Sequence, residues 1–213
     1  MPGRSHTLGA AARAVLLTLG LLLVLGGCGS SPSPPTGPRS VEPTPISQLN
    51  TDALQLARLE FCDLVPPGAV RDALGGGGAS TERSWRNGDR AEVETGVRDV
   101  VHEFGCSWAR RGYAAGAWLF ARSVTPAYAQ TVIDKTSRRP GCRSTRRPGF
   151  GAPSQRQVCD LPDGSHRVRI SGLFDDDWLT CQVSGPAAQP VRLVGKRAAA
   201  WCVQVANATN TAQ

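Results

Sequence analysis

The sequence is poor in histidine, lysine and methionine, and it lacks several familiar catalytic patterns. Its 213 residues include three histidines and one methionine. No H-E-x-x-H or G-x-S-x-G pattern occurs, so neither a zinc protease nor an α/β-hydrolase is indicated. The cysteines form no C-x-x-C pair, which argues against a zinc ribbon or a thioredoxin-type redox centre.

The sequence also lacks an apolar run of the roughly 20 residues that a transmembrane helix needs. Instead, Arg4 and Arg13 precede a shorter apolar run, 14–25, which is typical of a secretory signal peptide. The segment Leu25-Gly26-Gly27-Cys28 resembles a bacterial lipobox. That resemblance implies a diacylglyceryl thioether on Cys28, cleavage after Gly27 and further acylation by fatty acids such as palmitate. An ordinary signal peptide followed by an unmodified cysteine is the alternative.

Composition divides the remaining chain into a linker and a folded body. Residues 28–45 are rich in proline and serine, so we expect a lipidated N-terminus followed by a semi-extended tether. Apolar residues return at Ile46, and we expect a single domain over residues 46–207. Residues 208–213 are expected to form a disordered tail. The expected location is the extracytoplasmic face of a cell membrane.

Six cysteines follow Cys28, and an even number in an exported chain indicates disulfide bonds. Fifteen pairings are possible for six cysteines. We favour local pairing, which gives the bonds Cys62–Cys106, Cys142–Cys159 and Cys181–Cys202. Structural bonds of this kind would leave no free thiol for catalysis.

The pattern of apolar residues favours an α+β fold. Turn signals and alternation indicate strands near residues 100–110, 114–124, 155–161, 166–174 and 178–184. Capping residues and apolar spacing indicate helices near residues 62–75, 125–137 and 189–206. We therefore expect an antiparallel sheet of about five strands with helices packed on one face, clipped by disulfides.

Positive charge is concentrated after the second expected helix. The chain has a formal net charge of +7, and nearly all of its basic residues are arginine. This bias, with abundant alanine and glycine, suggests a GC-rich bacterial genome, so arginine number alone says little about binding. The candidate anion-binding residues are Arg138, Arg139, Arg143, Arg146 and Arg147. Their expected partners are anionic lipid or cell-wall polymer rather than nucleic acid, and a solvated loop is the alternative.

Other candidate sites are weaker. Trp85 lies in a polar segment, 79–98, and is the tryptophan that we expect to be exposed; contact with a carbohydrate or lipid ligand is the alternative to a solvated side chain. The acidic triplet 175–177 lacks the EF-hand pattern, so we expect a solvated turn and no metal or cofactor. His102 and His166 are the histidines of the mature chain, and neither lies in a catalytic pattern.

Two motifs resemble a family of exported actinobacterial lipoproteins whose shared domain has no assigned activity. They are Cys62-Asp63-Leu64-Val65 with a helix ending in Ala73-Leu74-Gly75, and Cys106-Ser107-Trp108. The resemblance covers roughly residues 62–206 and implies an outer-surface domain with a Cys62–Cys106 bond. Four further cysteines and a longer basic stretch depart from the family pattern. We expect a non-enzymatic binding or scaffolding module of the cell envelope, of unspecified oligomeric state. The alternative is an envelope enzyme or an enzyme accessory protein.

Overall fold

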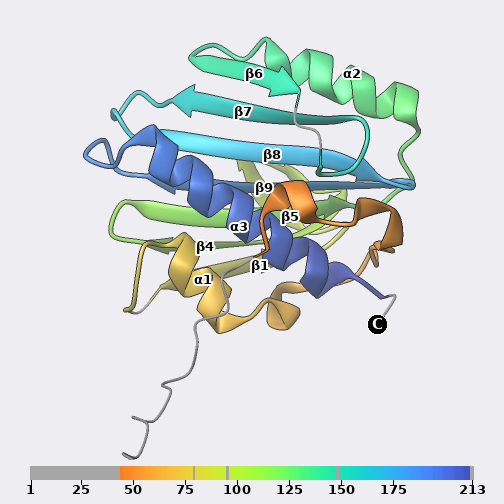
Figure 1. The fold of residues 1–213 in the computed structure, drawn as a ribbon, viewed down its shortest axis with the longest axis horizontal. Helices are drawn as coiled ribbons and strands as arrows, with labels where there is room; N and C mark the ends of the chain where they lie inside the picture. The colour runs from red at the N-terminus through yellow and green to blue at the C-terminus, as the bar shows by residue number, and fades with distance from the viewer. Residues whose placement is uncertain (1–43, 79, 95, 147–148, 212–213) are drawn as a thin grey trace, which may run out of the picture. The chain divides into compact units, whose positions relative to one another are not determined.

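The computed structural model describes residues 44–78, 80–94, 96–146 and 149–211, which form a seven-stranded antiparallel sheet (Figure 1). The strands lie in the order β1-β4-β5-β9-β8-β7-β6. Their bounds are β1 Thr81–Trp85, β4 Glu103–Arg110, β5 Tyr113–Phe120, β6 Cys142–Arg146, β7 Ser154–Asp160, β8 His166–Phe174 and β9 Asp177–Gly185.

The sheet is larger than the five strands that we expected from the sequence. The two additional strands are its edges, β1 and β6, and both are polar and largely exposed. An edge strand pairs on one side alone and often carries charged residues, so it lacks the apolar alternation by which buried strands are recognised.

Helices cover both faces of the sheet, which corrects the expectation of helices on one face. Val168 and Ile170 of β8 pack in the main core with α3 (Val191–Thr209), against which α1 (Pro67–Ala73) also packs. Leu173 of β8 points to the other face and packs with Trp178 against α2 (Pro126–Ser137). The two faces of β8 therefore line two separate cores, one covered by α3 and the other by α2.

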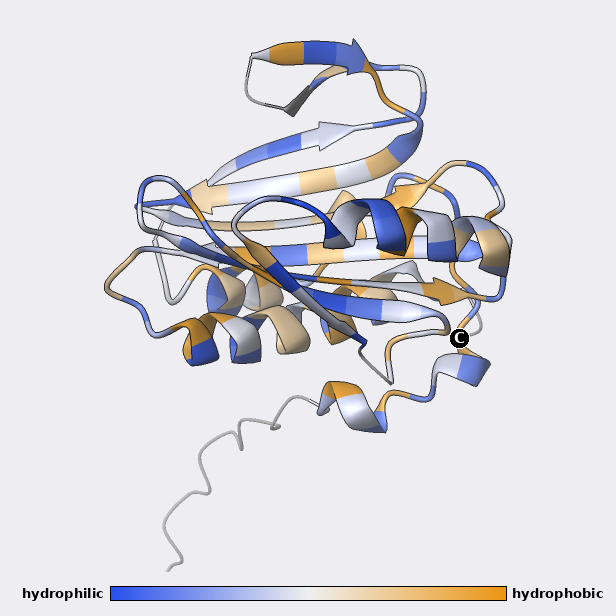
Figure 2. Cartoon of the chain, turned by 90° about the horizontal axis from the view of Figure 1, so that it is seen from above, coloured by the Kyte–Doolittle hydropathy of each residue, from blue (hydrophilic) through white to orange (hydrophobic). Residues whose placement is uncertain are grey.

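A small hairpin stands apart from the main sheet. It consists of β2 (Arg90–Glu94) and β3 (Val97–Val100). Hydrogen bonds between Val101 and residues 88 and 89 join its two flanks to each other at its base. The two views place this hairpin on the face of the sheet opposite α3 (Figures 1 and 2). The sequence predicted a polar excursion here, and the hairpin is its ordered form.

The main core lies between α3 and the central strands. Trp201 of α3 meets Trp108 of β4 edge to face, with ring centroids 5.3 Å apart. The indole Nε1 of Trp201 donates to the carbonyl of Gly116 at 2.9 Å. This bond satisfies both polar groups inside the core and fixes the helix along the sheet.

Three disulfide bonds clip the fold, and they join Cys62 to Cys106, Cys142 to Cys159 and Cys181 to Cys202. These are the local pairs that we favoured. The first joins the segment before α1 to β4, the second joins β6 to β7, and the third ties α3 to the central strand β9. Disulfide bonds of this number indicate an oxidising, extracytoplasmic compartment.

The C-terminal segment is ordered as far as it is described, so a disordered tail over residues 208–213 is wrong for residues 208–211. Helix α3 continues to Thr209, whose side chain is buried and donates to the carbonyl of Val205 at 3.0 Å. Asn210 then pairs with Leu56, and the amide of Thr211 donates to the carbonyl of Gln55 at 2.8 Å. The sequence did not reveal this pairing because the partner segment lies about 150 residues earlier.

Candidate anion-binding face

The arginine-rich stretch does not form the single basic patch that the sequence suggested. In β6, Arg143 lies opposite Val158 and Arg146 lies opposite Gln155. Because side chains alternate along a strand, these two arginines project from opposite faces of the sheet. Arg138 and Arg139 are exposed at the end of α2, and Arg147 and Cys28 lie outside the described residues.

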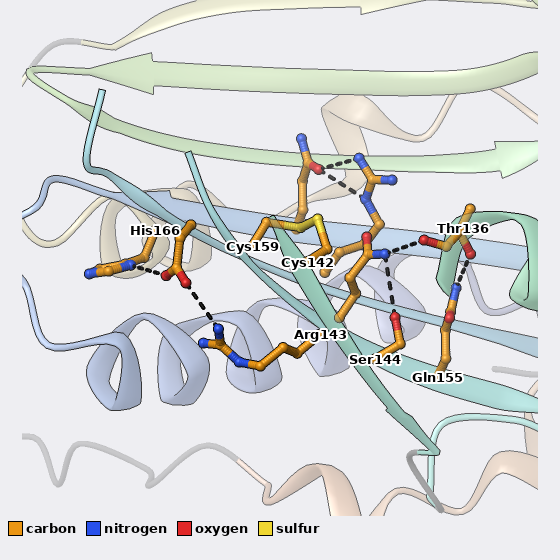
Figure 3. The surroundings of a disulfide bond; sticks show 11 residues. Thr136, Cys142, Arg143, Ser144, Gln155, Cys159 and His166 are labelled. Atoms are coloured by element: carbon orange, nitrogen blue, oxygen red, sulfur yellow. Dashed lines mark hydrogen bonds and ion pairs between the residues drawn. A yellow bond between two sulfur atoms is a disulfide. The ribbon is translucent and has the colours of Figure 1, made fainter. Parts of the chain in front are cut away.

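Arg143 is engaged in a surface network near the Cys142–Cys159 bond (Figure 3). Its guanidinium lies 3.0 Å from one oxygen of Asp160, and Nδ1 of His166 lies 2.9 Å from the other. Hydrogen bonds from Arg143 and then from His166 lower the pKa of Asp160. The paired charges leave little net attraction for an anion, so Arg143 is a poor candidate for the ligand site.

A different cluster of arginines lies on the face that carries α2. Arg167 and Arg169 alternate along β8 with Val168 and Ile170, which face α3. Both arginines therefore project to the opposite face, and the charge of Arg139 acts on both of them there. We call Arg139, Arg167 and Arg169 the arginine cluster.

The arginine cluster carries unpaired positive charge. None of its members forms an ion pair with any carboxylate in the described parts of the chain. Nε of Arg167 is buried and has no hydrogen-bond partner among those residues. A buried donor without a partner costs free energy, and an acceptor supplied by a ligand would recover that cost.

Burial and repulsion between neighbouring arginines together lower the pKa values of Arg167 and Arg169. The pKa of Arg169 is lowered to about 9, chiefly by burial and further by the charges of Arg167 and Arg139, against an opposing effect of Glu103. The pKa of Arg167 is lowered by burial and then by Arg139. A bound anion would relieve this repulsion, so the cluster is electrostatically prepared for a carboxylate or a phosphate.

Two neighbours hold Arg169 in position. Its Nε and Nη2 donate to Oε1 of Gln182 at 3.2 and 2.9 Å. Its guanidinium also lies over the ring of Trp118, 5.0 Å from the centroid. These contacts fix the planar fork of the guanidinium before any ligand arrives, which lowers the entropic cost of binding.

Glu103 and Trp85 complete this part of the face. Nε1 of Trp85 donates to Oε1 of Glu103 at 3.1 Å. Burial raises the pKa of Glu103 to about 7, although the bond from Trp85 and the charge of Arg169 both lower it. The Trp85 ring lies so close over Gly105 that a Cβ there would be 2.4 Å from Cζ2. Trp85 is thus half-buried rather than fully exposed, and Trp118 is also half-buried.

The acidic triplet 175–177, at the turn between β8 and β9, forms ion pairs with an arginine. Arg58 contacts Asp176 at 2.6 Å and Asp177 at 2.9 Å. In the part of the chain that the structure describes, no group of three or more histidine, cysteine, aspartate or glutamate side chains is placed to hold a metal ion. His102 is exposed, and the described residues include no helix long and apolar enough to cross a membrane.

The molecule is therefore a disulfide-clipped α+β domain with a partly covered basic sheet face. No family model matches the sequence, and no curated protein matches it. A solved structure with a similar arrangement is the extracellular domain of PknH from Mycobacterium tuberculosis. The two chains share 14% identity with a TM-score of 0.44, over 71% of this chain and 98% of that one.

Proposed function

We propose that this protein is a non-enzymatic binding module of the cell envelope, tethered through a lipid on Cys28, which captures an anionic ligand at the arginine cluster. One observation carries the proposal. Arg139, Arg167 and Arg169 share one sheet face, repel one another and have no carboxylate partner among the described residues. Positive charge held in this way is costly unless something else neutralises it.

The chemistry of the ligand follows from that of the guanidinium group. Arginine presents a planar fork of donors that matches a carboxylate or a phosphate, and such charge-assisted bonds are stronger than neutral ones. The proposed partner is an envelope component that carries one of these groups. The arginine cluster replaces Arg143 and Arg146 as the main determinant, because their side chains point to opposite faces.

The test is a titration of the mature chain with pyrophosphate and with trigalacturonate, followed by the fluorescence of its tryptophans. Arg139→Gln combined with Arg167→Gln is expected to weaken binding at least about tenfold, since each lost charge-assisted bond is worth more than 1 kcal/mol. Arg192→Gln, which removes an exposed charge from α3, is the matched control and should change affinity less than twofold. Equal affinity of the double variant and the wild type would refute the proposal.

A second arm of the same experiment separates a soluble anion from a lipid headgroup. Vesicles with and without phosphatidylglycerol are mixed with a variant that carries Cys28→Ser, so that the anchor itself does not contribute. Binding to a soluble anion without binding to anionic vesicles identifies a ligand away from the membrane surface. Binding to the vesicles that is lost in the double variant identifies a lipid headgroup.

An envelope enzyme is the alternative function, and the raised pKa of Glu103 is the observation that favours it. A carboxyl group with a pKa of about 7 can act as a general acid near neutral pH. Its fixed contact is with the indole of Trp85, however, and glycoside hydrolysis usually requires a second carboxylate nearby. Turnover of an acidic oligosaccharide that disappears in Glu103→Gln would establish the enzyme, whereas binding without turnover supports the binding module.

A further inference from the structure

An open, shallow cavity of about 880 Å³ lies on the sheet next to Arg167, which is paired with the lining residue Ser184. Its lining comes from β1, β4, β5 and β9, together with the turns that join β4 to β5 and β7 to β8. Among the lining residues, Thr81, Ala109, Ala114 and Ser184 have small side chains. The cavity is large enough for an organic ligand of several rings.

Strand register shows that the cavity adjoins the arginine cluster. Arg167 of β8 lies opposite Ser184 of β9, which lies opposite Ala114 of β5, which in turn lies opposite Ala109 of β4. Residues in register across an antiparallel sheet project from the same face. Arg167 and the small residues of the cavity therefore form one continuous row across four strands.

Positive charge also lies at the other end of this row. Arg110 and Arg111, at the turn between β4 and β5, both line the cavity. Arg110 is held by the carbonyls of Gly77 and Leu74, at 2.8 and 3.0 Å, and its Nε is buried without a partner among the described residues. Arg111 is exposed and forms no ion pair with the described acidic residues.

The acidic residue that lines the cavity is occupied by its own turn. Asp163 accepts hydrogen bonds from the hydroxyl and the amide of Ser165, at 2.6 and 2.9 Å. These bonds hold the carboxylate against the turn between β7 and β8. Asp163 makes no ion pair with Arg110 or Arg111. Arg110 is already engaged by two carbonyls and by the ring of Tyr113, so the exposed guanidinium of Arg111 is the one available to an anion.

From this arrangement we infer that the ligand is an extended acidic glycan, which places one acidic group at the arginine cluster and another at Arg111. This inference rests on the proposed function and adds the class and the length of the ligand. Neighbouring strands lie about 4.8 Å apart, so the step from β8 across β9 to β5 spans roughly 10 Å. A ligand that reaches both ends must be longer than a single sugar ring.

The lining favours a glycan over a chain of phosphates. Hydroxyl groups from Ser80, Thr81, Ser165 and Ser184 surround the cavity and can exchange hydrogen bonds with sugar hydroxyls. On the arginine side, Trp85 offers half-buried aromatic surface on which the apolar face of a sugar ring can pack, whereas the ring of Trp118 already lies against Arg169. Polyphosphate has no apolar face, so it would leave this surface unused.

The experiment measures how affinity depends on ligand length, with digalacturonate and hexagalacturonate as probes and the mature chain as receptor. The hexamer is expected to bind at least about tenfold more tightly than the dimer. Arg111→Gln should remove most of this gain while changing the affinity for the dimer less than twofold. Arg167→Gln should weaken both probes, and Arg192→Gln should weaken neither.

A second variant tests the path between the two ends. Ala114→Phe places a large ring in the middle of the row, so it should weaken the hexamer and leave the dimer almost unchanged. Circular dichroism and urea unfolding confirm that each variant is folded.

The outcomes separate this inference from the proposed function. Equal affinities for dimer and hexamer, or a hexamer that is insensitive to both Arg111→Gln and Ala114→Phe, would overturn the extended site and leave anion capture intact. Polyphosphate of equal charge that binds as tightly as hexagalacturonate would overturn the glycan class. If neither galacturonate nor pyrophosphate binds, both the extended glycan site and the proposed function are refuted.

Discussion

The guanidinium of Arg169 lies over the indole of Trp118, 5.0 Å from the ring centroid, and Gln182 binds the same guanidinium from the neighbouring strand. An arginine held on two sides, with no carboxylate partner among the described residues, presents its remaining donors in a fixed direction. The orientation of Arg169 therefore depends on both Gln182 and Trp118.

Gln182→Ala removes both hydrogen bonds to Arg169. We expect the free energy of unfolding to fall by about 1–3 kcal/mol, because a partly buried cation loses its acceptor. Affinity for pyrophosphate should also fall, by about fivefold, as the guanidinium becomes mobile. Gln130→Ala, which removes an exposed glutamine from α2, is the control for both urea unfolding and titration. A variant that loses stability and keeps full affinity would show that Gln182 does not orient Arg169.

Glu103 should make the protein less stable as pH rises. Its pKa in the folded state is about 7, against 4.5 for an ordinary glutamate, so between these values the folded state holds a proton that the unfolded state has released. The stabilisation is complete below pH 4.5 and is lost as pH rises through 7, with a limit of about 3 kcal/mol at 1.4 kcal/mol per unit. Glu103→Gln should flatten this dependence.

The measurement for Glu103 is urea unfolding at pH 5 and pH 8 for both the wild type and the variant. Comparing the two proteins isolates Glu103 from Asp177, whose pKa is also raised, to about 6, chiefly by burial. Parallel pH profiles would mean that Glu103 titrates normally.

Gly105 is required by the position of Trp85. Gly105→Ala would place a methyl group 2.4 Å from Cζ2 of Trp85, so the ring must move. We expect a loss of about 1–3 kcal/mol and a red shift of tryptophan fluorescence as Trp85 enters water. Gly77→Ala meets its nearest side-chain atom at 4.0 Å and should change neither quantity by much. An unshifted spectrum for Gly105→Ala would contradict this packing.

Intact-mass measurement of the mature protein from its native membrane tests the anchor and the cysteines together. The expected mass is that of a chain that begins at Cys28 and carries a diacylglyceryl group with further acylation. Alkylation without reduction should label none of the six cysteines in the three bonds, and alkylation after reduction should label all six. An unacylated chain with a free thiol would remove the lipoprotein interpretation and reopen thiol chemistry.

Alternation along β8 was enough to predict the two faces of that strand. In the sequence Val168 and Ile170 fall on one side of the strand and Arg167 and Arg169 on the other, and the structure has the same division. The sequence could not show that the face of Arg167 and Arg169 is covered only in part, by α2. That depends on how the connections around α2 lead this helix to the face opposite α3, which no local pattern encodes.

For the basic stretch, by contrast, the directions of the side chains were not predicted from the sequence. Arg143 and Arg146 are close in sequence, yet an odd spacing of three in a strand sends their side chains to opposite faces. The polar composition of the stretch favours a loop in the sequence, which hides this alternation. A signal was nevertheless present, because Cys142 begins a run of polar residues that can pair with the strand of Cys159.

Residues 55–57 pair with residues 209–211, and this pairing gives a path by which a pulling force is transmitted into the domain. Asn210 pairs with Leu56, and the amide of Ala57 donates to the carbonyl of Thr209 at 2.9 Å. A pull on the chain ahead of Gln55 therefore reaches the end of α3, and the Cys181–Cys202 bond passes it to β9, the middle strand of seven. The Cys62–Cys106 bond also carries such a pull to β4. The load is thus shared between two internal strands, and it does not start at an edge strand, β1 or β6.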